Sequence, residues 1–169
     1  MLKLINDLEP FFEDCYRRIS VREYAKIMKI SPPTASTLLK EFAKGGLLIK
    51  SSDRNYLFFN ANIQNKEFLD LSRIYWRNKL SEVLDLIEKK VISPTVILFG
   101  SLSKAEVKND SDVDLAILGV KKEIDFSILE KKLKRKVQVF WFKSIDDIKN
   151  KELANNIING YVLIGKLNL

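Results

Sequence analysis

Two short stretches decide the fold of the C-terminal half: Val-Ile-Leu-Phe-Gly-Ser at residues 96–101 and Asp-Val-Asp-Leu-Ala-Ile at residues 112–117. The first is an apolar strand that runs into a Gly-Ser turn, where we expect a short helix to begin. The second is a strand that opens with two acids separated by one residue. Alternate residues of a strand point to the same side, so Asp112 and Asp114 can bind the same hard cation.

The Gly-Ser turn has properties that suit a phosphate group. Gly100 lets the backbone approach a phosphate closely, and the Ser101 hydroxyl and the start of the following helix can donate hydrogen bonds to it. Lys104 follows, and it is either a third phosphate contact or an ordinary surface lysine. Metal ions that bridge triphosphate oxygens neutralise charge and align an in-line attack. Together these residues predict a site for a phosphate group and for a hard cation, which is Mg²⁺ or Mn²⁺ in its place.

The residues around these stretches alternate between strand and helix patterns. We expect an α+β domain with a mixed sheet, built from strands at 95–99, 113–118, 136–142 and 161–164, and from helices at 101–105, at 126–134, after the cap Ser144 and at 152–158.

This pattern resembles the DNA polymerase β-type nucleotidyltransferase superfamily, and especially its minimal, stand-alone members. The resemblance extends over residues 95–166 and includes a similar tail at residues 153–163. It implies transfer of a nucleoside monophosphate from a nucleoside triphosphate to an unidentified acceptor, with Mg²⁺ as cofactor. It also implies that Asp112 and Asp114 are the catalytic, metal-binding residues.

One position departs from the family pattern. Active members usually carry a third carboxylate on the next strand, where this chain has Gln138. An amide can coordinate a metal weakly, but it cannot act as a base at neutral pH. Glu106, Asp110 and Asp125 are alternative third acids, and their spacing favours none of them. The resemblance therefore leaves open whether the domain is catalytic.

The N-terminal part begins with helix patterns. Residues 4–18 have apolar side chains close to helical spacing, and we expect this helix to begin near Pro10. Ser20, with Glu23 three residues later, predicts a capping box for a helix that ends near Met28. Three further features are a cap at Ser31 with Pro32 in the first helical position, a helix end at Gly45-Gly46, and a β-hairpin with strands at 47–50 and 56–59 joined by the five-residue loop 51–55.

The order of three helices and a hairpin resembles the winged helix-turn-helix domains of bacterial and archaeal regulators. In such a domain the second helix of the helix-turn-helix lies in the major groove of DNA, and the wing contacts phosphates or the minor groove. Small hydroxylated side chains can approach base edges closely. The expected contacts to double-stranded DNA are Ser31, Thr34, Ser36, Thr37, Lys40 and Lys44 on the recognition helix and Lys50, Arg54 and Asn55 on the wing. Use of the same fold as a protein-interaction module is the alternative.

The complete prediction is an α+β chain of two domains. A winged helix-turn-helix domain occupies residues 1–65, a connector helix residues 66–92 and a nucleotidyltransferase-like domain residues 93–169. The apolar face of the long helix at 66–91 serves as a connector between domains or as a dimerisation surface. Winged helix proteins commonly pair to read two half-sites, so we expect a homodimer.

Composition narrows the classes of function. The chain has 169 residues and a net charge of +7, but no histidine, so catalysis must use carboxylates, hydroxyls, lysines or a bound metal. No apolar run approaches the roughly 18 residues that a membrane span needs, and no signal peptide opens the chain. The single cysteine, Cys15, fits a reduced cytoplasmic setting and is expected to be a small buried hydrophobe. The basic run at residues 131–136 is either a solvated helix end or a contact for triphosphate or nucleic acid.

Three functions fit these patterns. The first is a DNA-associated nucleotidyltransferase. The second, favoured by Gln138, is a transcriptional regulator in which the C-terminal domain senses a nucleotide without turning it over. The third is an antitoxin-like protein that pairs with a toxin-like partner and represses the operon they share.

Overall fold

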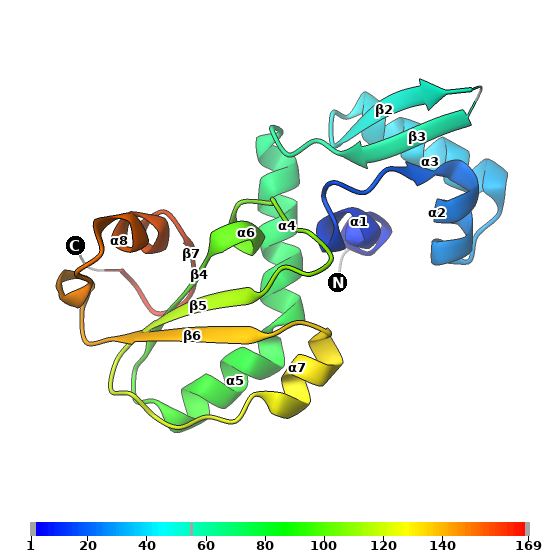
Figure 1. The fold of residues 1–169 in the computed structure, drawn as a ribbon. Helices are drawn as coiled ribbons and strands as arrows, with labels where there is room; N and C mark the ends of the chain where they lie inside the picture. Colours follow the sequence, from blue (N-terminus) through cyan, green and yellow to red (C-terminus); the bar gives the residue numbers. More distant parts are fainter. Residues whose placement is uncertain (1–2, 55, 168–169) are drawn as a thin grey trace. The chain divides into compact units, whose positions relative to one another are not determined.

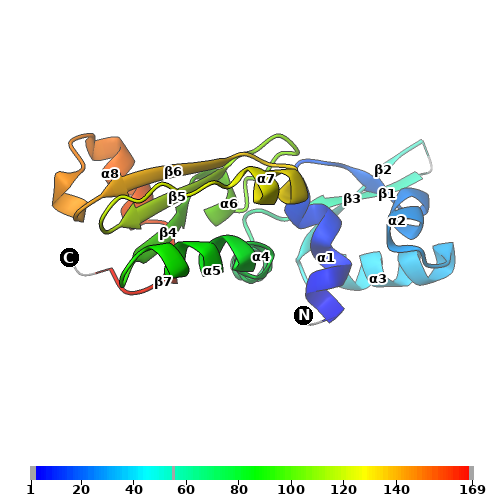
Figure 2. The same ribbon diagram turned by 90° about the horizontal axis from the view of Figure 1, so that it is seen from below.

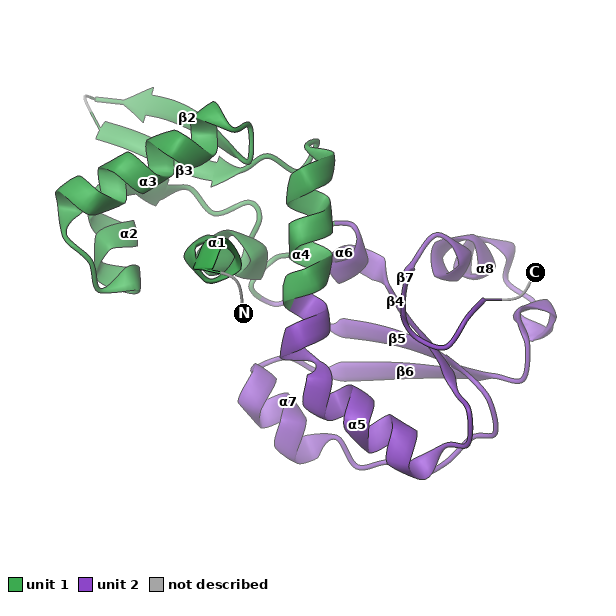
Figure 3. Ribbon diagram, turned by 180° about the vertical axis from the view of Figure 1, so that it is seen from behind, with its two compact units in different colours: residues 1–75, 105–109 green, residues 76–104, 110–169 purple. Residues whose placement is uncertain are grey.

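The computed structural model describes residues 3–54 and 56–167, which form helices and two β-sheets (Figure 1). The chain separates into two compact units, coloured green and purple in Figure 3. Unit 1 comprises Met1–Tyr75 and Ala105–Asn109, and unit 2 comprises Trp76–Lys104 and Asp110–Leu169. Among the helices of the described residues, none has both the length and the apolar character that a membrane crossing requires.

Unit 1 contains a small helical core and an antiparallel sheet with the strand order β1-β3-β2. The largest buried side chains here include Phe11, Tyr24, Leu39 and Phe59. The elements are α1 (Lys3–Glu13), β1 (Ile19–Ser20), α2 (Val21–Met28), α3 (Pro32–Lys44), β2 (Leu48–Asp53), β3 (Tyr56–Ala61) and the larger part of α4 (Lys66–Lys79).

Side-chain caps define where α2 and α3 begin, as the sequence predicts. The Ser20 hydroxyl accepts a hydrogen bond from the Glu23 backbone N–H at 3.2 Å, and the Glu23 carboxylate accepts one from the Ser20 backbone N–H at 3.5 Å. The Ser31 hydroxyl accepts from the Thr34 backbone N–H at 3.3 Å. These bonds satisfy N–H groups that have no partner within the helix. Both caps are therefore confirmed.

The first helix differs from the expectation. α1 begins at Lys3 and contains Pro10, so a helix start near Pro10 is wrong. A proline inside a helix removes one backbone hydrogen bond, which ordinarily costs about 3 kcal/mol. Ile5, Leu8 and Phe12 are buried along this helix, and the burial of their apolar surface offsets that cost.

The hairpin is longer and its turn is tighter than expected. Asp53 pairs with Tyr56, so two residues join the strands and the predicted loop 51–55 is wrong. Arg54 has a φ of 44°, in the left-handed region that tight hairpin turns require. β2 is an edge strand, where polar side chains can face water, and this explains why the polar residues 51–53 continue the strand.

β1 was not expected from the sequence. Ile19 pairs with Phe59 and Ser20 with Phe58, which adds a third strand to the hairpin. Ser20 is also the cap of α2, and cap residues have extended backbone, so one residue can serve both roles. A strand of two residues is too short to show the alternation that predicts strands.

A loop from the C-terminal half of the sequence completes unit 1. Ala105–Asn109 belongs to this unit, and the Cys15 backbone N–H donates to the Val107 carbonyl at 2.8 Å. Cys15 is buried, as expected, and so is Val107.

The predicted helix at 66–91 is two helices. α4 ends at Lys79 and α5 (Ser81–Lys90) follows, with Leu80 between them at φ −88° and ψ 3°. There is no proline or glycine at this position, so the sequence contains no signal for the break. Leu80 is fully buried, and the change of direction places Val83 and Ile87 in the interior of unit 2.

Unit 2 is built on a mixed sheet whose strands run side by side (Figure 2). The strand order is β6-β5-β4-β7, in which only the pair β5–β6 is parallel. This confirms the α+β class and the mixed sheet predicted for the C-terminal half. The remaining elements are β4 (Thr95–Phe99), α6 (Gly100–Ser103), β5 (Val113–Leu118), α7 (Ser127–Leu133), β6 (Val137–Phe142), the 3₁₀ helix η1 (Ile145–Asp147), α8 (Lys151–Ile158) and β7 (Tyr161–Ile164).

β4 is the buried centre of this sheet. Ile97 and Phe99 pack on one face with Ile148 and Ile157, from beside η1 and from α8. Val96 and Leu98 point to the opposite face, and they are also fully buried. A strand covered on both faces is held rigidly, and the turn that follows Phe99 is therefore placed with little freedom.

Candidate functional site

The Gly-Ser turn lies directly against the acid pair. Gly100 has a φ of 70°, and a Cβ atom added to it would lie only 2.4 Å from the Asp114 Oδ2 atom. Phe99 and Asp114 are paired residues of β4 and β5, which explains why the turn and the acid meet. Only glycine combines this backbone conformation with so close an approach. The two motifs that the sequence identified therefore form one site.

The two acids are held differently. Asp114 lies in β5, whereas Asp112 directly precedes the strand, and both side chains are partly buried. Burial raises the pKa of the Asp114 carboxyl above its usual value, and the negative charge of Asp112 raises it further. Two carboxylates that repel each other in this way are an arrangement that a bound cation stabilises.

Gln138 lies where the sequence predicts, on the strand beside the acids. It is paired with Asp114 in the parallel β5–β6 register. Its side-chain Nε2 atom donates a hydrogen bond to Asp112 Oδ2 at 2.5 Å. Within residues 3–54 and 56–167, no three or more His, Cys, Asp or Glu side chains are grouped to hold a metal ion. None of the alternative third acids thus joins Asp112 and Asp114 in such a group.

The remaining residues of the turn have separate roles. Ser101 is partly buried in α6, directly after Gly100. Ser103 is fully buried, and its hydroxyl donates to the Gly100 carbonyl at 2.9 Å, which holds the turn closed. Lys104 is exposed, and its Nζ atom donates to Asn156 Oδ1 of α8 at 3.0 Å. The roles of Ser103 and Asn156 cannot be predicted from the sequence, since neither can be seen without the neighbouring backbone or helix.

The basic run at residues 131–136 is not uniform. Lys131, Lys132, Lys134 and Lys136 are exposed, as expected for a solvated helix end. Arg135 is 6% exposed, so that expectation is wrong for this residue. Its guanidinium group donates to the Ser111 carbonyl next to Asp112. The sequence carries no signal that separates this arginine from the lysines around it.

The residues predicted to contact DNA lie on α3 and the hairpin of unit 1. On α3 and its cap, all but one are exposed, and Ser36 is partly buried. Three of the hydroxyls have local partners: Ser31 caps the helix and is hydrogen-bonded to the Thr34 hydroxyl at 2.8 Å, and Thr37 donates to the Pro33 carbonyl at 3.2 Å. The exposed residues are Ser31, Thr34, Thr37, Lys40 and Lys44.

On the hairpin, Lys50 is exposed in β2, and Arg54 is exposed in the connection to β3. Asn55, the third residue predicted there, lies outside the described residues. The hairpin therefore presents two cations to solvent.

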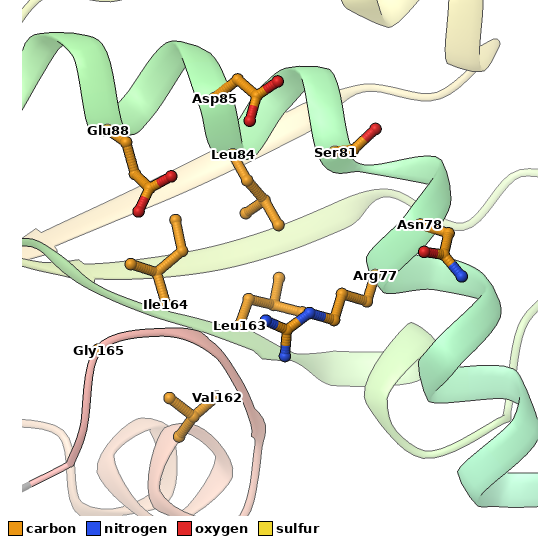
Figure 4. A pocket seen from close by; sticks show the side chains of 10 residues that line it. All are labelled: Arg77, Asn78, Ser81, Leu84, Asp85, Glu88, Val162, Leu163, Ile164 and Gly165. Carbon is orange, nitrogen blue, oxygen red and sulfur yellow. The ribbon is translucent and has the colours of Figure 1, made fainter.

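A separate cavity of about 490 Å³ lies elsewhere in unit 2. It is lined by residues of α4, α5 and β7 and by Gly165, and it contains none of the predicted site residues. Figure 4 shows Arg77 extending from α4 toward Leu163, while Asp85 and Glu88 project from α5. Its charged side chains are all exposed.

Comparison with known families agrees with the geometry of unit 2. The family model described as "Polymerase beta, Nucleotidyltransferase" matches residues 78–167, which is more than half of the chain. The matched region includes Gly100, Ser101, Asp112, Asp114 and Gln138. The search of curated proteins found no match.

Proposed function

The chain belongs to the polymerase beta nucleotidyltransferase family, and we propose that it binds a nucleoside triphosphate at the acid pair and transfers the nucleoside monophosphate to an acceptor. One observation carries this proposal: the Gly100 backbone lies against the Asp114 carboxylate, closer than any other residue type would permit. A phosphate that approaches the glycine turn is thereby brought beside both acids.

The side chains present fit a divalent cation such as Mg²⁺. Asp112 and Asp114 would hold it, because hard cations prefer carboxylate oxygens and the two charges raise each other's free energy when no cation is bound. Mn²⁺ has the same ligand preference. When bound, the cation would neutralise part of the negative charge of the triphosphate.

The chain's own residues would bind and orient the triphosphate. The turn at Gly100 offers backbone N–H groups to a phosphate, and the adjacent Ser101 hydroxyl is a further donor. Lys104 extends to Asn156 of α8, and its remaining N–H donors can serve a phosphate that enters beside the turn.

Calorimetric titration of the purified chain with ATP, GTP, CTP and UTP tests this proposal. Each titration is run with Mg²⁺ and repeated with EDTA in its place. The expected result is binding of at least one triphosphate that requires the metal. If no triphosphate binds under either condition, the site has lost the ligand that the proposal assigns to it.

The second candidate function is a nucleotide sensor that does not catalyse transfer. The hydrogen bond from Gln138 to Asp112 favours it, since the strand beside the acids offers an amide where a base is needed. Transfer requires the acceptor hydroxyl to lose its proton while pyrophosphate leaves. An amide cannot take that proton at neutral pH.

Replacing Gln138 by glutamate tests whether the missing carboxylate limits transfer. Q138E places a carboxylate on the strand beside Asp112 and Asp114, so we expect label transfer from an α-labelled triphosphate to rise about tenfold. A perfectly placed base contributes more, about a hundredfold or above, but glutamate here has no partner that orients it. Gln138→Met is the matched control, because it removes the hydrogen bond without adding charge. Equal transfer by the glutamate and methionine variants would contradict the prediction.

We further propose that unit 1 is a winged helix-turn-helix domain that binds double-stranded DNA, as a homodimer that reads two half-sites. The element order and the antiparallel order β1-β3-β2 support this assignment. So does the exposure of Lys40 and Lys44 on α3 and of Arg54 on the hairpin. A helix that enters the major groove from its first turn would leave these cations near phosphates.

Salt dependence tests the DNA proposal. We expect the affinity for a fluorescent mixed-sequence duplex to fall steeply between about 50 and 200 mM salt. Replacing both Lys40 and Arg54 by alanine removes two phosphate contacts. The plot of log affinity against log salt should therefore become shallower, with a slope smaller in magnitude by roughly 2. Lys89→Ala with Lys90→Ala, two exposed lysines of α5, is the control. An affinity and slope equal to those of the unchanged protein would rule out this docking mode.

A further inference from the structure

Arg135 is a buried cation that the proposed function does not use. It is 6% exposed, and its Nη1 atom donates a hydrogen bond to the Ser111 carbonyl at 2.7 Å. Its guanidinium carbon lies 5.1 Å from the centre of the Trp76 ring, which is fully buried. A buried charge persists only where such partners replace water, and planar guanidinium groups suit both a carbonyl and an aromatic face.

The hydrogen bond from Arg135 to the Ser111 carbonyl lies just before the part of β5 that is paired with its neighbouring strand. Asp114 is held within β5 between Phe99 on one neighbouring strand and Gln138 on the other. Asp112 lies before the first paired residue, Val113, and is therefore outside the ladder. Of the two acids, only Asp114 is positioned by the sheet itself.

The segment at residues 135–138 makes three hydrogen bonds to Asp112 and its two neighbours in the chain. Arg135 binds the carbonyl of the preceding residue, and the Lys136 carbonyl accepts from the Val113 N–H of the following residue at 2.8 Å. Gln138 binds the Asp112 carboxylate itself. Of these contacts, the arginine bond is the one that fixes the backbone through a side chain, so a substitution can remove it without disturbing strand pairing.

The end of α7 explains why this one basic residue turns inward. Lys134 ends the helix in the left-handed conformation, with a φ of 56°. The Arg135 backbone N–H then bonds to the Glu130 carbonyl at 3.3 Å, which closes the turn before β6. Lys134 and Lys136 on either side remain exposed.

We propose that Arg135 is a positioning residue. Its guanidinium group packs on the Trp76 ring and binds the Ser111 carbonyl, and this holds Asp112 beside Asp114 for a divalent cation. This inference rests on the proposed function in one respect, namely that the acid pair binds a cation. The arginine itself does not touch the cation or the triphosphate.

The experiment compares Arg135→Met and Arg135→Lys with the control Lys134→Met, which removes an adjacent exposed charge. Two quantities are measured on each full-length variant. The first is the ¹⁵N order parameter of the Asp112 backbone amide in protein without metal. The second is the affinity for Mn²⁺ alone, from water proton relaxation. A thermal unfolding curve identifies any variant that does not fold, and Arg135→Lys keeps the buried charge if the methionine variant fails.

We expect the Asp112 order parameter to fall from about 0.85, typical of rigid backbone, to below about 0.6 in Arg135→Met. The Mn²⁺ affinity should fall about tenfold, and Arg135→Lys should recover part of both, since an ammonium group can still donate to the carbonyl. Order at Val113 and Ala116 within β5 should not change. An Asp112 order parameter equal to that of Lys134→Met would overturn the inference. If the unchanged protein binds neither Mn²⁺ nor any triphosphate, the proposed function fails, while the order parameter still decides the role of Arg135.

Discussion

Replacing Asp112 and Asp114 together by asparagine is expected to abolish metal-dependent triphosphate binding and to lower label transfer by about a thousandfold or more. Both carboxylates that would hold the cation are then neutral amides, which coordinate Mg²⁺ weakly. Charge stabilisation by a metal ion contributes several kcal/mol, and a thousandfold change corresponds to about 4 kcal/mol. The measurement is calorimetric titration of the triphosphate that the unchanged protein binds, followed by an assay with the α-labelled form.

Stability distinguishes loss of the site from loss of the fold. Burial and Asp112 raise the pKa of Asp114 above its value in the unfolded chain, so its ionised form destabilises the metal-free fold once the pH exceeds that unfolded value. Asparagine removes this penalty, and we expect an unfolding temperature at neutral pH that is equal to or higher than that of the unchanged protein. Asp146→Asn, an exposed acid of η1, is the matched control and should leave binding unaffected. Binding that survives in the double variant would place the ligand elsewhere.

Replacing Gly100 by alanine is expected to weaken triphosphate binding about a hundredfold. The added Cβ atom would lie 2.4 Å from Asp114 Oδ2, so the Asp114 carboxylate must move out of the place where it and Asp112 would hold the cation together. A hundredfold loss corresponds to ~2.8 kcal/mol, which lies within the several kcal/mol that charge stabilisation by a metal ion contributes. Calorimetry with Mg²⁺ and the bound triphosphate measures this loss.

The same substitution also strains the backbone. Alanine at a φ of 70° costs about 1–2 kcal/mol, so the unfolding temperature should decrease slightly while the protein remains folded. Gly45→Ala is the matched control, because Gly45 has a φ of −74° and its added Cβ would meet no atom closer than 3.5 Å. A Gly100→Ala variant that binds as tightly as Gly45→Ala would show that the turn and the acids do not act as one site.

Much of the fold follows from local patterns in the sequence. The caps at Ser20 and Ser31 are confirmed because capping is a contact between residues three positions apart, which the sequence displays directly. The strands at 95–99, 113–118 and 161–164 are also confirmed, since apolar runs bounded by turn residues need no distant partner to be recognised. The pair Asp112 and Asp114 and the turn at Gly100 could be predicted for the same reason.

Other features depend on contacts between distant residues. Packing outweighs the local preference at Pro10 inside α1, whereas the break at Leu80 and the short strand β1 have no local signal in the sequence. The polar residues 51–53 read as a loop, yet they pair with β3 on an exposed edge of the sheet.

The sequence by itself determined which residues form the candidate site and that Gln138 stands beside the acids instead of a carboxylate. Only the tertiary structure decided how those residues meet: Gly100 against Asp114, Gln138 bonded to Asp112, and Arg135 buried on Trp76. The physical reason is the distance along the chain over which each kind of interaction acts. Capping, periodicity and turn preferences act over a few residues, whereas Ser111 and Arg135 come together only when β5 and β6 pair and α7 ends beside them.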